Sequence, residues 1–173
     1  VIEEFLVGPE ISIHALSDGK NYKIFPSSQD HKRIGDGDTG LNTGGMGVIG
    51  PLPFVGEKMI ERIEKEIIAP TLQGMIDDGT PFEGILYPSL MLTPEGPKII
   101  EFNARFGDPE CQVYMRLLDS DLLEIINACI DKKLDQIEMK WGKNVFACNI
   151  ALASGGYPGN YEKGKKIYGI DEA

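Results

Sequence analysis

A β-hairpin between residues 82 and 102 is the feature that most constrains the fold of this chain. Residues 82–92 are strongly apolar, which predicts a buried strand. Thr93-Pro94-Glu95-Gly96 has the proline and glycine of a turn, and the residues from Pro97 to Phe102 predict the returning strand. The chain is therefore expected to contain an antiparallel pair of strands whose second member ends in the polar sequence Glu101-Phe102-Asn103-Ala104-Arg105.

The polar end of this hairpin carries three functional side chains at alternate positions. Because side chains alternate between the two faces of a strand, Glu101, Asn103 and Arg105 are expected to share one face. Carboxylate and amide oxygens suit Mg²⁺ or Mn²⁺, and Mg²⁺ commonly bridges one or two protein groups to substrate phosphates. Arg105 would then face a phosphate or an oxyanion. A polar strand edge facing water, with Arg105 paired to Glu101, explains the same spacing equally well.

Residue periodicity predicts further strands and two main helices. Residues 11–16 and 22–25 alternate around a turn, so the first 25 residues favour an antiparallel meander in which His14 is a strand histidine with a satisfied partner rather than a metal ligand. Apolar residues recur at helical spacing from Met59 to Ile76, with a kink or restart expected at Pro70. A second helix is predicted over residues 121–130, and Asp108-Pro109-Glu110 has the chemistry of a helix start.

Residues 29–50 show no periodicity and predict a long loop that binds a ligand. Glycines recur between residues 35 and 47, where they allow backbone N–H groups to converge on an anion. Lys32 and Arg33 add positive charge, and Arg33 offers a planar fork to a phosphate. A flexible surface loop is the alternative, but the basic pair together with aspartate, hydroxyl and amide side chains favours binding.

Composition excludes several classes of function. A formal net charge of -10 argues against nucleic acid as a partner, because such binding requires a basic face. No apolar run approaches the roughly 20 residues that a membrane span needs, so we expect no membrane partner. Cys111, Cys129 and Cys148 are widely separated, which is typical of reduced cysteines in a cytoplasmic protein and indicates neither a disulfide framework nor a zinc site.

The residue pattern changes after Lys132-Lys133, where a new apolar strand is predicted over residues 145–153. We expect a domain boundary there, with residues 1–133 in one domain and residues 134–173 opening a second, incomplete α/β domain. Val1 begins the chain inside an apolar stretch without an initiator methionine, so we also expect a fragment of a longer polypeptide.

The first ten residues add a third part of a nucleotide site. An extended segment at Glu3-Glu4-Phe5-Leu6 can offer its backbone groups to a purine edge, and the carboxylate of Glu10 can accept hydrogen bonds from ribose hydroxyls. Walker A and Rossmann glycine patterns are absent, and no arrangement suggests a nucleophile. A purine edge, a phosphate loop and a metal with an arginine together indicate phosphoryl transfer from a nucleoside triphosphate.

These residues resemble a known family. The initial Glu3-Glu4-Phe5-Leu6 segment and the sequence Glu101 to Arg105 resemble the C-terminal half of an ATP-grasp domain. Four further segments resemble the phosphoribosylamine–glycine ligases of purine biosynthesis and occur in the order found in that family: residues 29–33, residues 42–47, residues 105–110 and residues 153–159. The resemblance extends over essentially the whole chain. The resemblance implies an α+β fold, the ATP-grasp C-terminal subdomain, with an antiparallel sheet and flanking helices.

The resemblance also implies an activity and a set of site residues. The expected reaction joins glycine to 5-phosphoribosylamine with ATP, through glycyl phosphate, in the cytoplasm. Glu3, Leu6 and Glu10 would contact ATP, with Glu101 and Asn103 as ligands of Mg²⁺ or Mn²⁺ and Arg105 as the catalytic residue. The substrate contacts implied are Asp30, Lys32, Arg33, Asn42, Thr43, Gly44, Gly45 and Asp108, the last as a candidate for the ammonium group of glycine.

Two other functions remain open from the sequence. A related ATP-grasp ligase that joins a different carboxylate and amine would use the same metal residues, so the stretch from Asp30 to Met46 would distinguish it. A nucleotide-binding module without catalysis is the second alternative. The triphosphate-covering half of the family's ATP-grasp domain is not in this sequence, so we expect the isolated 173-residue chain to be inactive.

Overall fold

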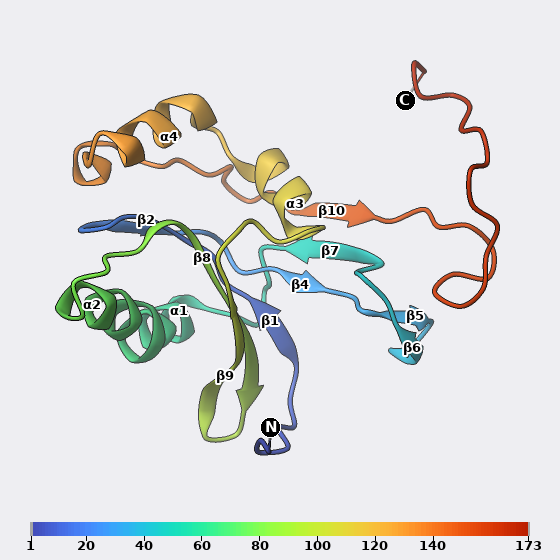
Figure 1. Cartoon of the computed structure of the whole chain (residues 1–173), viewed down its shortest axis with the longest axis horizontal. Coiled ribbons are helices and arrows are strands. Elements are labelled where there is room, and N and C mark those ends of the chain that lie inside the picture. The colour runs from blue at the N-terminus through green and yellow to red at the C-terminus, as the bar shows by residue number, and fades with distance from the viewer. Residues whose placement is uncertain (1, 173) are drawn as a thin grey trace.

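The computed structural model describes residues 2–172 and is built around a five-stranded antiparallel sheet with helices on both faces (Figure 1). The predicted hairpin is confirmed as the centre of this sheet, where β8 (Glu83–Thr93) pairs with β9 (Gly96–Asn103). The other edge of β8 pairs with β1 (Glu10–Ser12) and β2 (Ala15–Asp18), and β3 (Tyr22–Ile24) completes the sheet beside β2. The expected α+β class is confirmed.

Strands β1 and β2 together form the strand predicted over residues 11–16, with one interruption. Ile11 lies opposite Leu90 and Ala15 lies opposite Leu86, so the register is the same on both sides of the interruption. Pro88 would lie opposite Ile13 in that register and has no N–H for the ladder, which accounts for the break. The predicted β2–β3 hairpin is confirmed. Residues 2–9 form neither helix nor strand, and Val1 lies outside the described residues.

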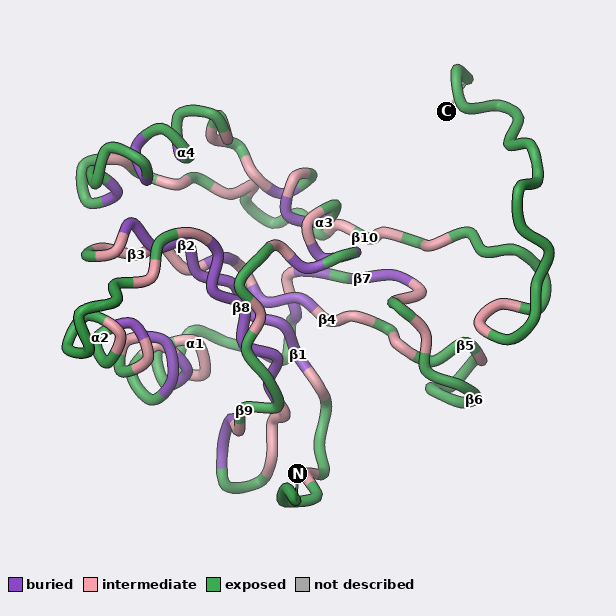
Figure 2. The backbone as a smooth tube through the Cα atoms, viewed as in Figure 1, coloured by how far each residue is buried: buried purple, intermediate pink, exposed green. Residues whose placement is uncertain are grey.

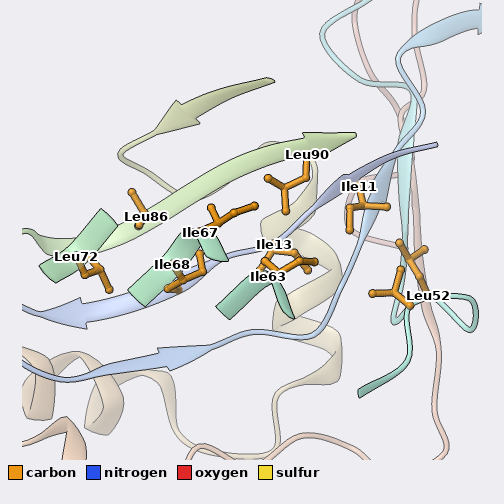
Figure 3. Packing of buried hydrophobic residues seen from close by; sticks show 11 residues of the cluster. Ile11, Ile13, Leu52, Ile63, Ile67, Ile68, Leu72, Leu86 and Leu90 are labelled. Carbon is orange, nitrogen blue, oxygen red and sulfur yellow. The ribbon is translucent and has the colours of Figure 1, made fainter. Parts of the chain in front are cut away.

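One face of the sheet packs against a long helical segment. Alternate residues of the sheet, including Ile11, Ile13 and Leu90, are fully buried against Ile63 and Ile68 of that segment (Figure 3). The segment consists of α1 (Glu57–Ile63), a π-helical turn (Glu64–Ile68) and α2 (Ala69–Asp77). The expected restart at Pro70 is confirmed, because the π-helical turn ends at Ile68 and the proline lies in the first turn of α2, where its missing N–H is tolerated.

The opposite face packs against α3 (Glu110–Leu117) and α4 (Leu122–Ile130), so both predicted helices are confirmed (Figure 1). The strand residues that alternate with those of the first core point toward α3 and α4. Among them, Leu16 packs with Tyr114 of α3 and Ile125 of α4. Asp121 caps α4 by accepting hydrogen bonds from the N–H groups of Leu123 at 2.7 Å and Glu124 at 3.2 Å. A short 3₁₀ turn, Leu134–Gln136, follows α4.

The expectation of a structureless loop at residues 29–50 is wrong. The segment forms two nested antiparallel pairs: β4 (Gln29–Asp30) with β7 (Gly47–Gly50), and β5 (Arg33–Gly35) with β6 (Thr39–Asn42). Positive φ angles at Asp38 and at Gly37 and Gly40 form the tip. Strands β5 and β6 are largely exposed on both faces (Figure 2), so their sequences show no alternation of apolar and polar residues. The hairpin depends instead on the backbone conformation of its turn.

The strand predicted at residues 145–153 is β10 (Ala147–Ile150), and it pairs with β7. Together β10, β7 and β4 form a three-stranded sheet that packs against α3 through Val48, Val113 and Leu117. Residues 151–172 contain neither helix nor strand and are largely exposed (Figure 2). Among residues 2–172, no helix is both long and apolar enough to span a membrane. The domain boundary near residue 133 stays a prediction.

Candidate functional site

A β-bulge near the end of β9 orients the predicted metal residues. Leu90 pairs with Ile99, but Ser89 pairs with Glu101, so β9 has one extra residue, Ile100, at this point. Residues directly opposite each other share a face. Glu101 and Asn103 therefore share the face of Ser89 and Tyr87 on β8, which is the side toward α3 and α4.

Glu101, Asn103 and Arg105 lie together, as the alternation predicted. The Asn103 amide donates a hydrogen bond to Glu101 Oε1 at 3.2 Å, and Arg105 Nη2 donates to Asn103 Oδ1 at 3.3 Å. Arg105 also donates to the carbonyl oxygen of Phe106 at 2.8 Å, which fixes its guanidinium over the turn between β9 and α3. Glu101 and Arg105 are exposed and Asn103 is half-buried, so the oxygen donors and the cation are accessible to a ligand.

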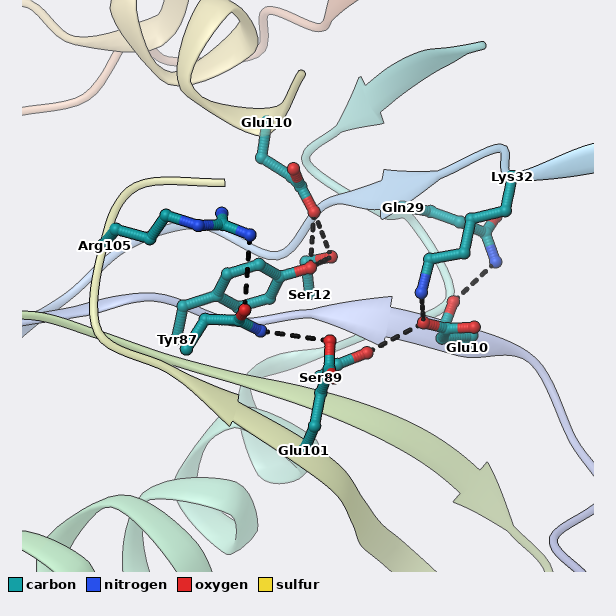
Figure 4. A network of polar contacts seen from close by, with 10 residues as sticks. Glu10, Ser12, Gln29, Lys32, Tyr87, Ser89, Glu101, Arg105 and Glu110 are labelled. Atoms are coloured by element: carbon teal, nitrogen blue, oxygen red, sulfur yellow. Dashed lines mark hydrogen bonds and ion pairs between the residues drawn. The ribbon is translucent and has the colours of Figure 1, made fainter. Parts of the chain in front are cut away.

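Glu10 connects this cluster to the segment after β4 (Figure 4). Its carboxylate pairs with Lys32 Nζ and accepts a hydrogen bond from Ser89 Oγ at 2.8 Å. Although burial lowers the pKa of Lys32, its hydrogen bond to Glu10 and the charges of Glu10, Asp30 and Glu101 raise that pKa above its ordinary value. Lys32 is therefore a fixed cation beside the carboxylates of Glu10 and Glu101.

Two adjoining grooves meet at Glu10 and Met91. One has a volume of about 430 Å³ and is lined by Glu3, Leu6 and their neighbours, with Lys98 on its wall. The other has a volume of about 750 Å³ and is lined by residues on both sides of the β5–β6 hairpin, including Asp30, Lys32, Arg33 and Asn42. The structure thus brings Glu3, Leu6 and Glu10 beside the predicted substrate residues, with Glu10 between the two grooves.

Asp30 lies at the buried end of the larger groove. Burial, together with the negative charges of Glu110, Glu10 and Asp108, raises the pKa of Asp30 to about 7, although the positive charge of Lys32 opposes the rise. Its Oδ1 atom is buried and has no hydrogen-bond partner within the described part of the chain. The side chain can therefore exchange a proton near neutral pH or accept a hydrogen bond from a ligand.

The turn at residues 43–45 is held by its own hydrogen bonds and lies against Pro109, directly before α3. Thr43 Oγ1 donates to the carbonyl oxygen of Lys32 at 2.8 Å and accepts from the Gly45 N–H at 3.0 Å. A Cβ at Gly45 would lie 2.6 Å from Pro109 Cδ and 2.9 Å from Asp30 Oδ1, so only glycine fits. The Gly44 N–H donates to the hydroxyl of Tyr157 at 3.0 Å. The Thr43 hydroxyl is thus hydrogen-bonded within the protein, and Gly45 lies beside Asp30 Oδ1.

Arg33, Asn42 and Asp108 are exposed around this centre. Arg33 donates to the carbonyl oxygen of Gly40 at 3.1 Å and lies 3.8 Å from Asp38, within the β5–β6 hairpin. Asn42 pairs with Arg33 across the same hairpin. Asp108 precedes α3 and accepts a hydrogen bond from Gln112 at 2.8 Å. No group of three or more histidine, cysteine, aspartate and glutamate side chains among residues 2–172 could hold a metal by itself.

Sequence reasoning missed a buried polar cluster beneath the site. Glu110 is only 2% exposed, and His14 is fully buried with both ring nitrogens in hydrogen bonds, which confirms that His14 has satisfied partners. Burial, aided by the charge of Arg105, lowers the pKa of His14 to about 3, so the ring is neutral. The sequence Asp108-Pro109-Glu110 indicates a helix start and gives no sign that the Glu110 side chain is buried.

Comparisons with known proteins identify the family. A family model for the ATP-grasp (A) domain of phosphoribosylglycinamide synthetase matches residues 1–111. The chain is 51% identical over 173 residues to a phosphoribosylamine–glycine ligase of Agrobacterium fabrum, covering 100% of this chain and 41% of that protein. It is 49% identical over 172 residues to the ligase of the same name from Brucella melitensis, covering 99% of this chain and 40% of that protein.

A solved structure agrees with these matches. The crystal structure of phosphoribosylamine–glycine ligase from Thermotoga maritima superposes with a TM-score of 0.73 at 38% identity, covering 92% of this chain and 40% of that one. The chain therefore spans about two-fifths of the length of these relatives. By its sequence and its fold, the chain belongs to the phosphoribosylglycinamide synthetase family, whose ATP-grasp domain includes residues 1–111.

Proposed function

We propose that this chain supplies the metal-binding and phosphoryl-transfer part of a ligase that joins glycine to 5-phosphoribosylamine at the expense of ATP. The products are glycinamide ribonucleotide, ADP and phosphate, and the reaction belongs to purine biosynthesis. The observation that carries the proposal is the identity of about half of the residues with phosphoribosylamine–glycine ligases over the whole chain. The clustering of Glu101, Asn103 and Arg105 at the end of β9 supports it independently.

ATP is proposed to lie along the two grooves that meet at Glu10. The backbone near Glu3 and Leu6 would form hydrogen bonds with the edge of adenine, and Glu10 would accept hydrogen bonds from the ribose. This places the triphosphate toward Lys32 and the end of β9, where cationic side chains are available to neutralise it. Glu10 would share its carboxylate between Lys32 and the ribose, because Lys32 and Ser89 both contact Oε1 and Oε2 can then accept from the ribose.

The donor set at the end of β9 fits a divalent cation that is held mainly by phosphates. Glu101 and Asn103 offer one carboxylate and one amide oxygen, which is the small protein contribution that Mg²⁺ accepts when substrate oxygens complete its shell. When bound, Mg²⁺ or Mn²⁺ supplies charge neutralisation of the phosphate oxygens during transfer.

The proposed chemistry has two steps. A carboxylate oxygen of glycine attacks the γ-phosphorus of ATP, the bond from that phosphorus to the bridging oxygen breaks, and ADP leaves with that electron pair. The amine of 5-phosphoribosylamine then attacks the acyl carbon of glycyl phosphate, loses a proton, and phosphate leaves. Arg105 would stabilise charge on the transferring group and on the oxyanion at the acyl carbon. Asp30, Lys32, Arg33, Asp108 and the turn at residues 42–45 are the proposed substrate contacts.

The competing function is a related ATP-grasp ligase for a different acid and amine. The test compares ADP formation by the full-length polypeptide with glycine and 5-phosphoribosylamine against other acid and amine pairs. The proposal predicts that both substrates are required and that replacing either one reduces the rate to background. Equal turnover with another carboxylate would contradict it and favour the alternative, whereas ATP binding without any turnover would favour a module without catalysis.

Three finer points belong to the same proposal. Residues 1–133 would form the end of the ATP-grasp domain and residues 134–173 the start of a further domain, although β10 still pairs with β7. A cytoplasmic location is proposed from the family's role in purine biosynthesis and from Cys111, Cys129 and Cys148, all of which are free thiols. The expected partners are small molecules, without nucleic acid or membrane.

A further inference from the structure

The buried cluster beneath Arg105 is not used by the proposed chemistry, and it links the site to the centre of the sheet. Glu110 begins α3, Ser12 lies on β1 and Tyr87 on β8, so three separate elements meet at one carboxylate (Figure 4). All three side chains are buried, with exposed fractions of 2% for Glu110, 3% for Ser12 and 6% for Tyr87. A carboxylate at this depth is costly unless hydrogen bonds compensate for the lost water.

Two hydroxyl groups provide that compensation at a single oxygen atom. Tyr87 donates to Glu110 Oε1 at 2.6 Å, and Ser12 Oγ donates to the same atom at 2.8 Å. Burial raises the pKa of Tyr87, and the hydrogen bond to Glu110 raises it further, so the phenol keeps its proton and acts as donor. Hydrogen bonds to a charged acceptor are short and strong, so the start of α3 is fixed to β1 and β8.

The same carboxylate also fixes the turn between β9 and α3 at Gly107. A Cβ at Gly107 would collide with the carboxylate of Glu110, whose Cδ would lie only 2.6 Å away. The Gly107 N–H donates to His14 Nε2 at 3.0 Å, and its carbonyl oxygen accepts from the Cys111 N–H at 3.0 Å. Because Nε2 of the neutral ring is an acceptor, Nδ1 carries the proton and faces the Tyr114 hydroxyl at 2.8 Å. Gly107 is thus restrained on three sides.

Arg105 lies two residues before Gly107 and has one hydrogen bond inside the same turn, to the Phe106 carbonyl oxygen. A displacement of the turn would therefore displace the guanidinium. We propose that Glu110, held by Tyr87 and Ser12, is a positioning residue that fixes the Arg105–Pro109 turn on the sheet so that Arg105 faces the transferring phosphoryl group. This inference rests on the proposed function, and it assigns to Glu110 no contact with substrate.

The first test removes the hydroxyl of Tyr87 or the charge of Glu110 in the full-length polypeptide. Tyr87→Phe and Glu110→Gln are expected to lower kcat for ADP formation about tenfold and to leave the KM for ATP unchanged, because a displacement of about 1 Å can cost about 100-fold and the remaining hydrogen bonds keep the displacement smaller. Glu110→Ala should lose more, since Gln keeps an oxygen that accepts the two hydroxyl donors. The matched control is Tyr22→Phe, which removes a tyrosine–glutamate hydrogen bond of 2.9 Å to Glu64 on the other face of the sheet.

The second test asks whether the effect passes through Arg105. In an Arg105→Ala background, adding Tyr87→Phe should lower kcat no further, because the group it positions is already absent. Thermal unfolding of Tyr87→Phe and Tyr22→Phe measures the structural cost of each change separately from kcat. A merely structural role predicts that kcat falls equally in both single variants, or that the losses of Tyr87→Phe and Arg105→Ala multiply, and either result overturns the inference.

The wild-type protein separates this inference from the function on which it rests. Turnover that requires glycine in the wild type, with multiplying losses in the double variant, overturns the positioning role alone. Absence of turnover with glycine and 5-phosphoribosylamine in the wild type overturns the proposed function, and the positioning role with it. Turnover in the wild type supports both when kcat falls in the Tyr87 and Glu110 variants but not in Tyr22→Phe, and when Tyr87→Phe causes no further loss in the Arg105→Ala background.

Discussion

One extra residue in β9 decides the direction of the two proposed metal ligands. The hairpin turn fixes the register up to Ile99, and a regular strand continuing from there would point Glu101 and Asn103 into the apolar face that packs on α1 and α2. The bulge at Ile100 reverses the alternation, so both side chains lie with Ser89 on the polar face. The site therefore depends on backbone geometry as much as on the identity of its side chains.

Glu101→Gln tests the metal assignment at the scale of one residue. The substitution keeps the size of the side chain and removes its charge, so we expect kcat/KM for ATP to fall about 100-fold, or about 2.7 kcal/mol of transition-state stabilisation. The measurement is the rate of ADP formation as a function of Mg²⁺ or Mn²⁺ concentration. Glu124→Gln on the exposed face of α4 is the control. An unchanged metal dependence in Glu101→Gln would show that the assignment is wrong.

The raised pKa of Asp30 predicts a pH dependence of stability. Between the ordinary value of 3.8 and about 7, folded Asp30 retains a proton that the unfolded chain releases, so the stability contributed by this group falls as pH rises through that window. Asp30→Asn removes this loss. We expect the melting temperature of Asp30→Asn to exceed that of the wild type at pH 8 and to match it near pH 4, with Asp38→Asn as a control for removing a carboxylate. A constant difference at every pH would contradict the assigned pKa.

Among the elements, those with side-chain periodicity were predicted and those built from backbone geometry were not. The β8–β9 hairpin, the helices and the restart at Pro70 follow from apolar spacing and from proline chemistry. The pairing of β5 with β6 could not be predicted from the sequence, because both strands expose both faces and their turn depends on positive φ angles. Glu110 could not be recognised as buried, because its partner Ser12 lies 98 residues away in the sequence.

Helix α4 offers a test of local structure that is independent of function. Asp121 accepts two backbone hydrogen bonds at its N-terminus, so Asp121→Ala should lower the free energy of unfolding by about 1 kcal/mol. For a chain of this size that corresponds to a melting temperature about 2–4 °C lower. Asp119→Ala is the neighbouring control, since Asp119 makes no capping bond to α4. Equal melting temperatures for Asp121→Ala and the wild type would contradict the cap.

At the scale of the whole molecule, the central sheet separates two different tasks. Its face toward α1 and α2 is an apolar core. Its face toward α3 and α4 combines a second core with the buried polar cluster under Glu110, and the site residues lie where that face reaches the end of β9. In the small sheet of β4, β7 and β10, Asp30 ends β4, and Lys32 follows two residues later and reaches Glu10. Distant segments of the sequence thus meet at one groove.

The transfer of oxygen from glycine to phosphate tests the central claim most directly. Glycine labelled with ¹⁸O in its carboxylate is supplied to the full-length polypeptide together with ATP, 5-phosphoribosylamine and Mg²⁺, and the released phosphate is analysed by mass spectrometry. Activation through glycyl phosphate predicts one labelled oxygen in each phosphate released, because the carboxylate oxygen that attacks the γ-phosphorus leaves with it. Phosphate that forms without the label, at the same rate with and without glycine, would contradict the account.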